Sequence, residues 1–105
     1  MRPNRYTVRL LSIAEQDLQE ILDFIAADSL QAALTLADRI ETDLYRLGQH
    51  PYLGKVPNDE GLVGMGYRVL VIENYLVFYK VKGRTVLVHR ILHGARDLPG
   101  LLEDM

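Results

Sequence analysis

Three β-rich runs near the end of the chain limit its possible folds more than any other feature. The runs are Tyr67–Ile72, Tyr75–Val81 and Thr85–Leu92, and the links between them hold only two and three residues. Strands joined by such short links pair with their neighbours as antiparallel hairpins. The sequence therefore predicts a three-stranded antiparallel meander.

The predicted meander is apolar on both of its faces. In an antiparallel sheet with one wet face, apolar and polar residues alternate along each strand. Here Val69–Ile72, Leu76–Tyr79 and Val86–Val88 are apolar without alternation. We expect helices to cover one face and a partner chain or second copy to cover the other, because large exposed apolar patches mark interaction sites. The alternative cover is the chain's own long loop together with its C-terminal tail.

A strand and a first helix are predicted upstream of the meander. The β-branched and apolar run Tyr6–Leu11 is typical of a short strand. Ser12 followed by Glu15 has the capping-box spacing, so we expect the helix to begin there. Asp17 is one of the polar residues assigned to its solvent-facing surface. The apolar stripe of this helix consists of Ala14, Leu18, Ile21, Leu22 and Ile25.

A second helix is predicted after a tight link. Asp28 or Ser29 can cap its start, and Gly48 is placed to end it. Residues 49–66 contain six Pro and Gly residues, so we expect a long loop without a regular element through most of that stretch. The apolar positions of the second helix, spaced by four and three residues, are Ala33, Ala37, Ile40, Leu44 and Leu47.

The order of these elements predicts the fold class. A strand, an α-helical hairpin and a three-stranded antiparallel meander make an α+β domain, with the helices packed on one face of a largely antiparallel sheet. A chain of 105 residues has room for one hydrophobic core. We therefore expect residues 1–105 to form a single domain.

Composition excludes several classes of protein. The chain has no cysteine, so disulfide frameworks and thiolate metal sites or nucleophiles are excluded. The first residues are charged and polar, and they lead into an apolar run too short for a signal peptide or a membrane span. We therefore expect a cytoplasmic protein that does not associate with membranes.

The net charge of −2 conceals an uneven distribution. Residues 1–50 carry a charge of −3, whereas residues 67–96 carry +5, with six basic residues against Glu73 alone. Such a split fits either a polyanionic target or an acidic protein partner. The charge distribution leaves both open.

Several polar residues late in the chain are candidates for chemistry. Metal-independent RNA cleavage needs a base, an acid and fixed positive charge at the phosphate. Arg68 and Arg90 could supply the charge, and Tyr79 or His93 the proton transfer. His89 and Arg90 are neighbours on a strand, so they point to opposite faces unless a bulge intervenes.

Ordinary structural roles compete with each of these assignments. A lone strand arginine is more often a surface or ion-pair residue than a catalytic one. His50 and His89 are better explained as packing or turn residues than as ligands. No metal or cofactor is predicted, because the three histidines lack acidic companions at metal-ligand spacing and no glycine-rich phosphate loop is present.

Several motifs taken in order resemble the RelE/ParE toxins of type II toxin–antitoxin (plasmid stabilisation) modules. The resemblance covers nearly the whole chain and is carried by the order of the elements and by Gly66–Val69, Val77–Tyr79, Ile91–Asp97 and the pair Leu101 and Leu102. It implies a cognate antitoxin that wraps the toxin and binds operator DNA, so that the toxin reaches DNA only indirectly. It is compatible with a homodimer or with a heterotetramer that includes the antitoxin.

The favoured branch of this superfamily is the ParE-like one. The run Leu92–Asp97 resembles the ending of ParE-like members, which implies inhibition of DNA gyrase through binding rather than catalysis. On that reading, Arg96, Leu101 and Leu102 are the candidate target contacts.

Two other functions stand beside it. RelE-like members imply a ribosome-dependent mRNA endoribonuclease, for which Arg68, Tyr79, Arg90 and His93 are the catalytic candidates. Many of those members carry a tyrosine shortly after the C-terminal basic cluster, and residues 97–100 of this chain contain none. The third possibility is a module that is not toxic and only binds its antitoxin.

Overall fold

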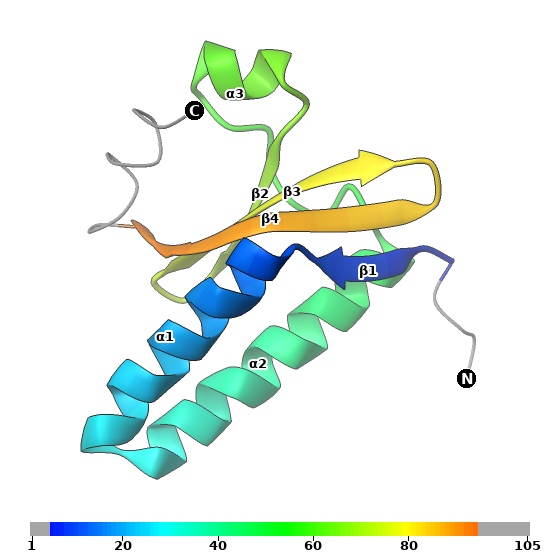
Figure 1. Cartoon of the computed structure of the whole chain (residues 1–105). Helices are drawn as coiled ribbons and strands as arrows, with labels where there is room; N and C mark the ends of the chain where they lie inside the picture. The colour runs from blue at the N-terminus through cyan, green and yellow to red at the C-terminus, as the bar shows by residue number, and fades with distance from the viewer. Residues whose placement is uncertain (1–4, 95–105) are drawn as a thin grey trace.

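The fold is a four-stranded sheet with a long helical hairpin on one face and a short helix on the other (Figure 1). The computed structural model describes residues 5–94. In chain order the elements are β1 Thr7–Leu10, α1 Ser12–Asp28, α2 Leu30–Gln49, α3 Glu60–Gly64, β2 Arg68–Ile72, β3 Tyr75–Lys82 and β4 Thr85–His93. The predicted α+β class is confirmed.

The predicted start of the second helix is confirmed, whereas its end lies at Gln49, one residue beyond the Gly48 that was expected to end it. Ser29 caps α2, since its hydroxyl accepts the Ala32 N–H at 3.1 Å. The predicted capping box at Ser12 is wrong, because Leu11 occupies the N-cap position and no side chain caps α1. The Leu11 N–H donates to the Val88 carbonyl of β4, so Leu11 still belongs to the sheet pairing when α1 begins. No linker residue with a polar side chain is left between the strand and the helix to cap α1.

The sheet has the strand order β1-β4-β3-β2. The β2–β3 and β3–β4 pairs are antiparallel, which confirms the predicted meander. β1 lies parallel to β4 and pairs only with its first half, from Thr85 to Val88. The sheet is therefore mixed, and the segment with the helical hairpin carries the chain from β1 at one edge of the sheet to β2 at the other.

The face of the sheet that meets α1 and α2 holds the main core. Each fully buried side chain of leucine or isoleucine size contributes roughly 1.5–3 kcal/mol, so this cluster dominates stability. The predicted helical stripes supply much of it, although Leu36 is buried where Ala37 and Leu44 are only half-buried. The buried members are Ala14, Ile21, Leu36, Ile40, Leu47, Ile72, Val77, Tyr79, Val86, Val88 and Ile91.

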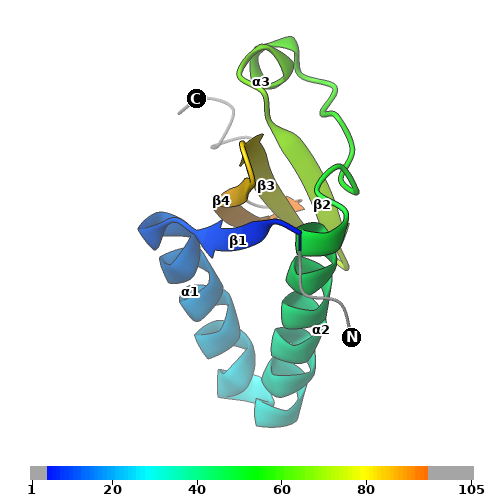
Figure 2. The same cartoon turned by 90° about the vertical axis from the view of Figure 1, so that its right-hand side faces the viewer.

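The opposite face of the sheet, called the outer face below, is turned away from α1 and α2 (Figure 2). Here Leu62 and Tyr67 pack against Phe78 and Leu92, and all four are buried. Leu62 belongs to α3, so the long loop folds back over the sheet. Of the two covers expected for this face, the chain's own loop therefore supplies part.

The short helix α3 was not expected in that loop. Asp59 stabilises its start, because its Oδ1 accepts the Leu62 N–H at 3.0 Å. A helix this short has little stability of its own, so the burial of Leu62 is what holds it on the sheet. Beyond its reach, Val71 remains 56% exposed on β2.

Candidate functional site

A bulge in β4 places His89 and Arg90 on the same face of the sheet. Tyr79 pairs with Val88 and Phe78 pairs with Arg90, so His89 has no partner of its own on β3. Cross-strand partners point to the same side, and the Phe78 ring lies on the outer face. A bulge therefore intervenes between His89 and Arg90, and both side chains point to the outer face.

Arg90 is held by an acidic residue of α1. Its Nε and Nη2 atoms donate to the two carboxylate oxygens of Asp17 at 2.8 and 3.0 Å. Asp17 also accepts the Ile91 N–H at 3.0 Å, at the part of β4 that β1 does not cover. The assignment of Asp17 to a solvent-facing surface is therefore wrong, because the carboxylate takes the place of a strand partner.

Arg68 and Tyr79 lie opposite each other on β2 and β3 and hold a loop against the sheet. The Arg68 guanidinium donates to the carbonyls of Gly54 and Tyr52 at 3.2 and 3.3 Å. The phenol oxygen of Tyr79 accepts the Gly54 N–H at 2.8 Å. Tyr79 is fully buried, and burial raises its pKa more than Gly54 and Arg68 lower it.

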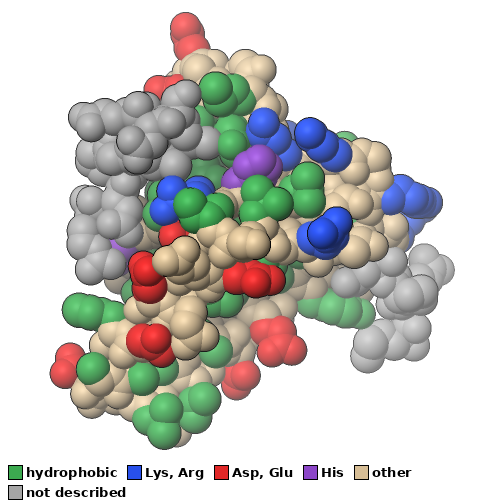
Figure 3. Space-filling model, viewed as in Figure 1, with side chains coloured by type: hydrophobic (Ala, Val, Ile, Leu, Met, Phe, Trp, Pro, Cys, Tyr) green, Lys and Arg blue, Asp and Glu red, His purple; other side chains and the backbone are tan. Residues whose placement is uncertain are grey.

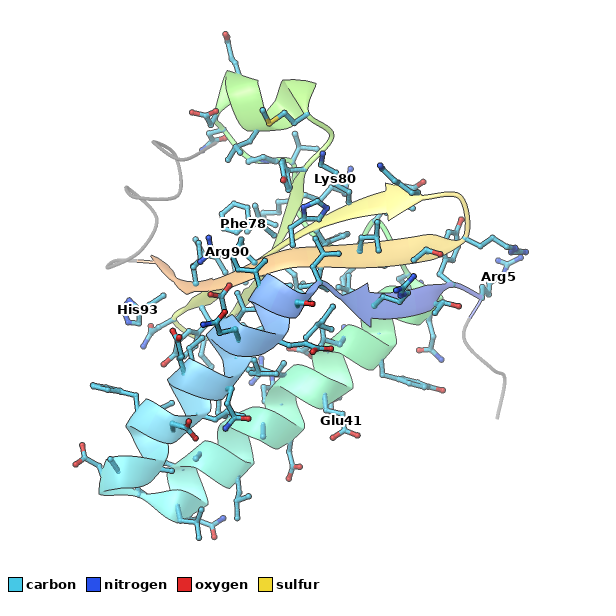
Figure 4. All side chains as sticks on the ribbon, in the orientation of Figure 1. Arg5, Glu41, Phe78, Lys80, Arg90 and His93 are labelled. Atoms are coloured by element: carbon cyan, nitrogen blue, oxygen red, sulfur yellow. The ribbon has the colours of Figure 1, made fainter. Side chains whose placement is uncertain are left out.

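His93 lies apart from that pair, at the end of β4 (Figure 4). Its ring packs edge-on against Tyr75, with the ring centroids 5.5 Å apart. Tyr75 precedes Tyr79 by four residues on β3, which corresponds to about 13 Å along a strand. The structure therefore brings together Arg68 and Tyr79 but not Arg90 or His93.

The remaining candidates from the sequence are His50, Arg96, Leu101 and Leu102. His50 is exposed at the C-terminal end of α2, where its backbone N–H donates to the Arg46 carbonyl. Arg96, Leu101 and Leu102 lie outside the described residues.

In residues 5–94 no group of three His, Asp or Glu side chains is placed to hold a metal ion. No helix in this range is long and apolar enough to cross a membrane.

Basic side chains gather on the outer face, in a group called the basic row below. Arg9 of β1 lies opposite Leu87 of β4, which lies opposite Lys80 of β3. Lys82 follows on the same side of β3. With Arg90, these residues form the basic row: Arg9, Lys80, Lys82 and Arg90. Figure 3 shows basic side chains over the strands and acidic ones mainly over the helical hairpin.

Tyr67 and His89 form an aromatic pair beside the basic row. The Tyr67 hydroxyl lies 3.1 Å from His89 Nδ1, and the ring centroids are 5.1 Å apart with nearly perpendicular planes. The Lys80 ammonium lies 4.5 Å from the centre of the Tyr67 ring, which is cation–π geometry. The pair thus helps to position Lys80 on the outer face.

An apolar hollow lies next to this group. It has a volume of about 400 Å³, between the loop that precedes α3 and the outer face of β2 and β3. One acidic residue, Asp59, lines it, and that carboxylate already caps α3. The lining residues are Pro57, Asn58, Asp59, Leu62, Val69, Leu76 and Phe78.

His89 makes stability depend on pH. Burial, followed by the charges of Lys80 and Lys82, lowers the pKa of His89 below its ordinary value of 6.5. The neutral imidazole is therefore favoured on folding, and its Nε2 atom is buried with no hydrogen-bond partner among the described residues. Its stabilising contribution is complete above the unfolded pKa and is lost as the pH falls toward the folded pKa.

We expect the urea midpoint of the natural chain to fall between about pH 7 and pH 5 by more than that of His89→Gln. The variant keeps an acceptor for Tyr67 but cannot titrate, and the carboxylates contribute equally to both proteins. Parallel falls of the two midpoints would show that His89 titrates as it does in the unfolded chain.

The chain is similar to known proteins both in sequence and in structure. The model of the family described as "ParE toxin of type II toxin-antitoxin system, parDE" matches residues 8–98. A chain of the chromosomal ParDE system from P. aeruginosa superposes with a TM-score of 0.69 at 21% identity, covering 86% of this chain and 97% of that one. A chain of the RelBE2 toxin–antitoxin complex from Mycobacterium tuberculosis gives 0.55 at 22% identity, covering 85% and 98%. No curated protein matches the sequence significantly.

The two solved structures support the fold alone, because their sequence identities to this chain are low. The family match rests on sequence and spans most of the chain. It includes both Gly66–Val69 and Ile91–Asp97, the motifs that carried the resemblance. The chain belongs to the ParE toxin family of type II toxin–antitoxin systems.

Proposed function

We propose that this chain is a toxin that acts by binding DNA gyrase and is neutralised by a cognate antitoxin. Binding is favoured over RNA cleavage because three of the catalytic candidates, Arg68, Tyr79 and Arg90, already make hydrogen bonds within the fold. Arg68 donates to two loop carbonyls, and the Tyr79 hydroxyl is buried against Gly54. Both side chains are thus engaged in contacts with the loop at Gly54.

The chemistry of RNA cleavage strengthens this argument. A general acid or base must reach the substrate and have a pKa near the working pH. Tyr79 is fully buried and its pKa is raised, so it meets neither condition. Arg90, the other candidate source of charge, is paired with Asp17 on the opposite face from the Tyr79 ring. An endoribonuclease would have to break these hydrogen bonds before Arg68, Tyr79 or Arg90 could act on RNA.

The partners in the proposal follow from the family. The similar ParDE and RelBE2 structures are toxin–antitoxin systems. We propose that this toxin likewise forms a cytoplasmic complex with an antitoxin, as a heterotetramer or around a toxin homodimer, and meets operator DNA only through the antitoxin. The gyrase assignment rests on the ParE-like run Leu92–Asp97, with Arg96, Leu101 and Leu102 as proposed contacts.

Induction of the chain without its antitoxin tests the proposal. Plasmid supercoiling and primer extension on abundant messages are measured in the same cultures. We expect filamentation, gyrase-linked DNA breaks and intact messages. Codon-positioned cuts in the messages with normal supercoiling would support the endoribonuclease instead. Growth without either effect would leave an antitoxin-binding module that is not toxic.

Substitutions separate target contact from folding. We expect Arg96→Ala together with Leu101→Ala to raise the concentration needed for gyrase inhibition about tenfold or more, the cost of losing contacts worth about 1–2 kcal/mol. The matched variant is Arg68→Ala, whose effect should follow the fraction of folded protein. Full gyrase inhibition by the tail variant, or a loss by Arg68→Ala at unchanged stability, would contradict this assignment.

A further inference from the structure

The outward side of α2 presents a stripe of exposed acidic and apolar side chains. Leu34, Asp38, Glu41 and Tyr45 are spaced by four, three and four residues, so they share one side of the helix and are called the α2 stripe below. Leu34 is 54% exposed and Tyr45 is 40% exposed. Asp38, Glu41 and Tyr45 line, together with Thr42, a hollow of about 500 Å³. Exposed apolar side chains beside a hollow are typical of an interaction site.

The helical hairpin that carries this stripe is strongly acidic. Residues 12–49 contain eight Asp and Glu residues and two arginines, a net charge of −6. Both arginines, Arg39 and Arg46, donate to Asp43, at 3.1 and 3.5 Å. The outer face has the opposite sign, because it carries the basic row (Figure 3). The α2 stripe therefore favours a partner with a basic surface.

The basic row of the same molecule cannot be that partner. Glu41 lies on α2 and Lys80 lies on the outer face, with the sheet between them (Figure 4). Two copies joined through their α2 stripes would place Asp38 and Glu41 opposite their own equivalents, and like charges repel. The α2 stripe of one copy set on the outer face of the next would pair opposite charges instead.

The outer face holds one hollow and two lysines in a line. The apolar hollow of about 400 Å³ lies beside Phe78. Lys80 and Lys82 follow Phe78 by two and four residues on the same side of β3, or about 7 and 13 Å along the strand. Lys82 is exposed, and Lys80 is half-buried with its ammonium over the Tyr67 ring. A surface with one apolar side chain followed by two carboxylates at similar spacing would match this line.

We propose that free copies of this chain associate head-to-tail, with the α2 stripe of one copy on the outer face of the next. Tyr45 enters the hollow, and Glu41 and Asp38 pair with Lys80 and Lys82. Glu41 and Asp38 precede Tyr45 by four and seven residues, or about 6 and 10 Å along a helix, and the long, flexible lysine side chains take up the difference in spacing. Such an interface does not close on itself, so the association extends into open chains. It depends on neither gyrase nor an antitoxin.

Sedimentation equilibrium of the purified chain tests the association. In about 0.05 M salt we expect the average mass to rise with concentration beyond that of a dimer. In about 0.5 M salt the dissociation constant should be about tenfold higher or more, because the paired charges are largely exposed. A chain that stays monomeric up to about 1 mM, or a dimer that neither grows nor responds to salt, would overturn the proposal.

Two neutralised variants locate the two halves of the interface. Asp38→Asn with Glu41→Gln removes the carboxylates of the α2 stripe, and Lys80→Gln with Lys82→Gln removes the ammonium groups of β3. Each variant alone should self-associate at least about tenfold more weakly than the natural chain. An equal mixture should form one-to-one dimers that do not extend, because only one intact pair of surfaces remains. Full association of either variant alone, or a mixture without dimers, would contradict the head-to-tail contact.

A control variant on α1 separates specific pairing from net charge. Glu20→Gln with Asp23→Asn changes the net charge as much as the α2 variant does, and both residues are exposed. Its self-association should stay within about twofold of the natural chain, and a loss as large as that of the α2 variant would sink the specific contact. Circular dichroism checks folding. Zero-length cross-linking of mixed light and heavy isotope copies should join Glu41 of one copy to Lys80 of another, and the absence of such links would also count against the proposal.

Discussion

Replacing Asp17 with alanine is expected to lower the free energy of unfolding by about 3–5 kcal/mol, the range seen when one partner of a buried ion pair is removed. The Asp17 side chain is 11% exposed and that of Arg90 is 27% exposed. The change leaves the guanidinium without its carboxylate and the Ile91 N–H without its acceptor. Urea denaturation measures the effect as a fall in midpoint at an unchanged slope.

The same helix offers a matched control for Asp17. Asp23 is exposed and accepts one hydrogen bond from Gln19, so Asp23→Ala should change stability by no more than about 0.5 kcal/mol. Adding Arg90→Met to Asp17→Ala should recover part of the loss, because it removes the charge that has lost the Asp17 carboxylate. A loss below about 1 kcal/mol for Asp17→Ala would show that the pair behaves as a surface salt bridge.

Replacing Gly54 with alanine is expected to cost about 2–4 kcal/mol, from steric overlap together with a lost buried hydrogen bond. A Cβ atom at this position would lie 2.7 Å from the Tyr79 hydroxyl oxygen and 2.8 Å from the Val69 carbonyl oxygen. The second of these belongs to backbone in the sheet and cannot rotate away. The loop must therefore shift, and the Gly54 contact with Tyr79 breaks.

Gly64 provides the comparison for Gly54. A Cβ atom there meets nothing within 4 Å, so Gly64→Ala should remain within about 0.5 kcal/mol of the natural chain. Thermal or urea denaturation of the two variants side by side checks the difference. If Gly54→Ala were as stable as Gly64→Ala, the loop would not be anchored as the Arg68 and Tyr79 contacts require.

Local patterns predicted much of the fold. The two helices were recognisable from apolar spacing and from Ser29, whose cap depends only on residues a few positions away. The meander was recognisable from its short links, which leave adjacent strands little choice but to pair. The family was recognisable from motifs such as Ile91–Asp97. Each of these signals is contained in a short stretch of chain.

The site depends on contacts between distant parts of the chain. The β4 bulge at His89 cannot be read from alternation, because nothing local distinguishes it from a regular strand position. Asp17 had the pattern of a surface residue and found its partner more than seventy positions away. Arg68 and Tyr79 had the chemistry of a nuclease pair, yet both serve the loop at Gly54.

The sequence by itself determined the element types, the meander and the family, since periodicity, link length and short motifs are local properties. Only the tertiary structure decided the parallel pairing of β1, the shared face of His89 and Arg90, and the alignment of Arg9 with Lys80 across three strands. Strand register and side-chain pairing depend on packing between segments far apart in the chain, and a shift of one residue reverses which face a side chain occupies.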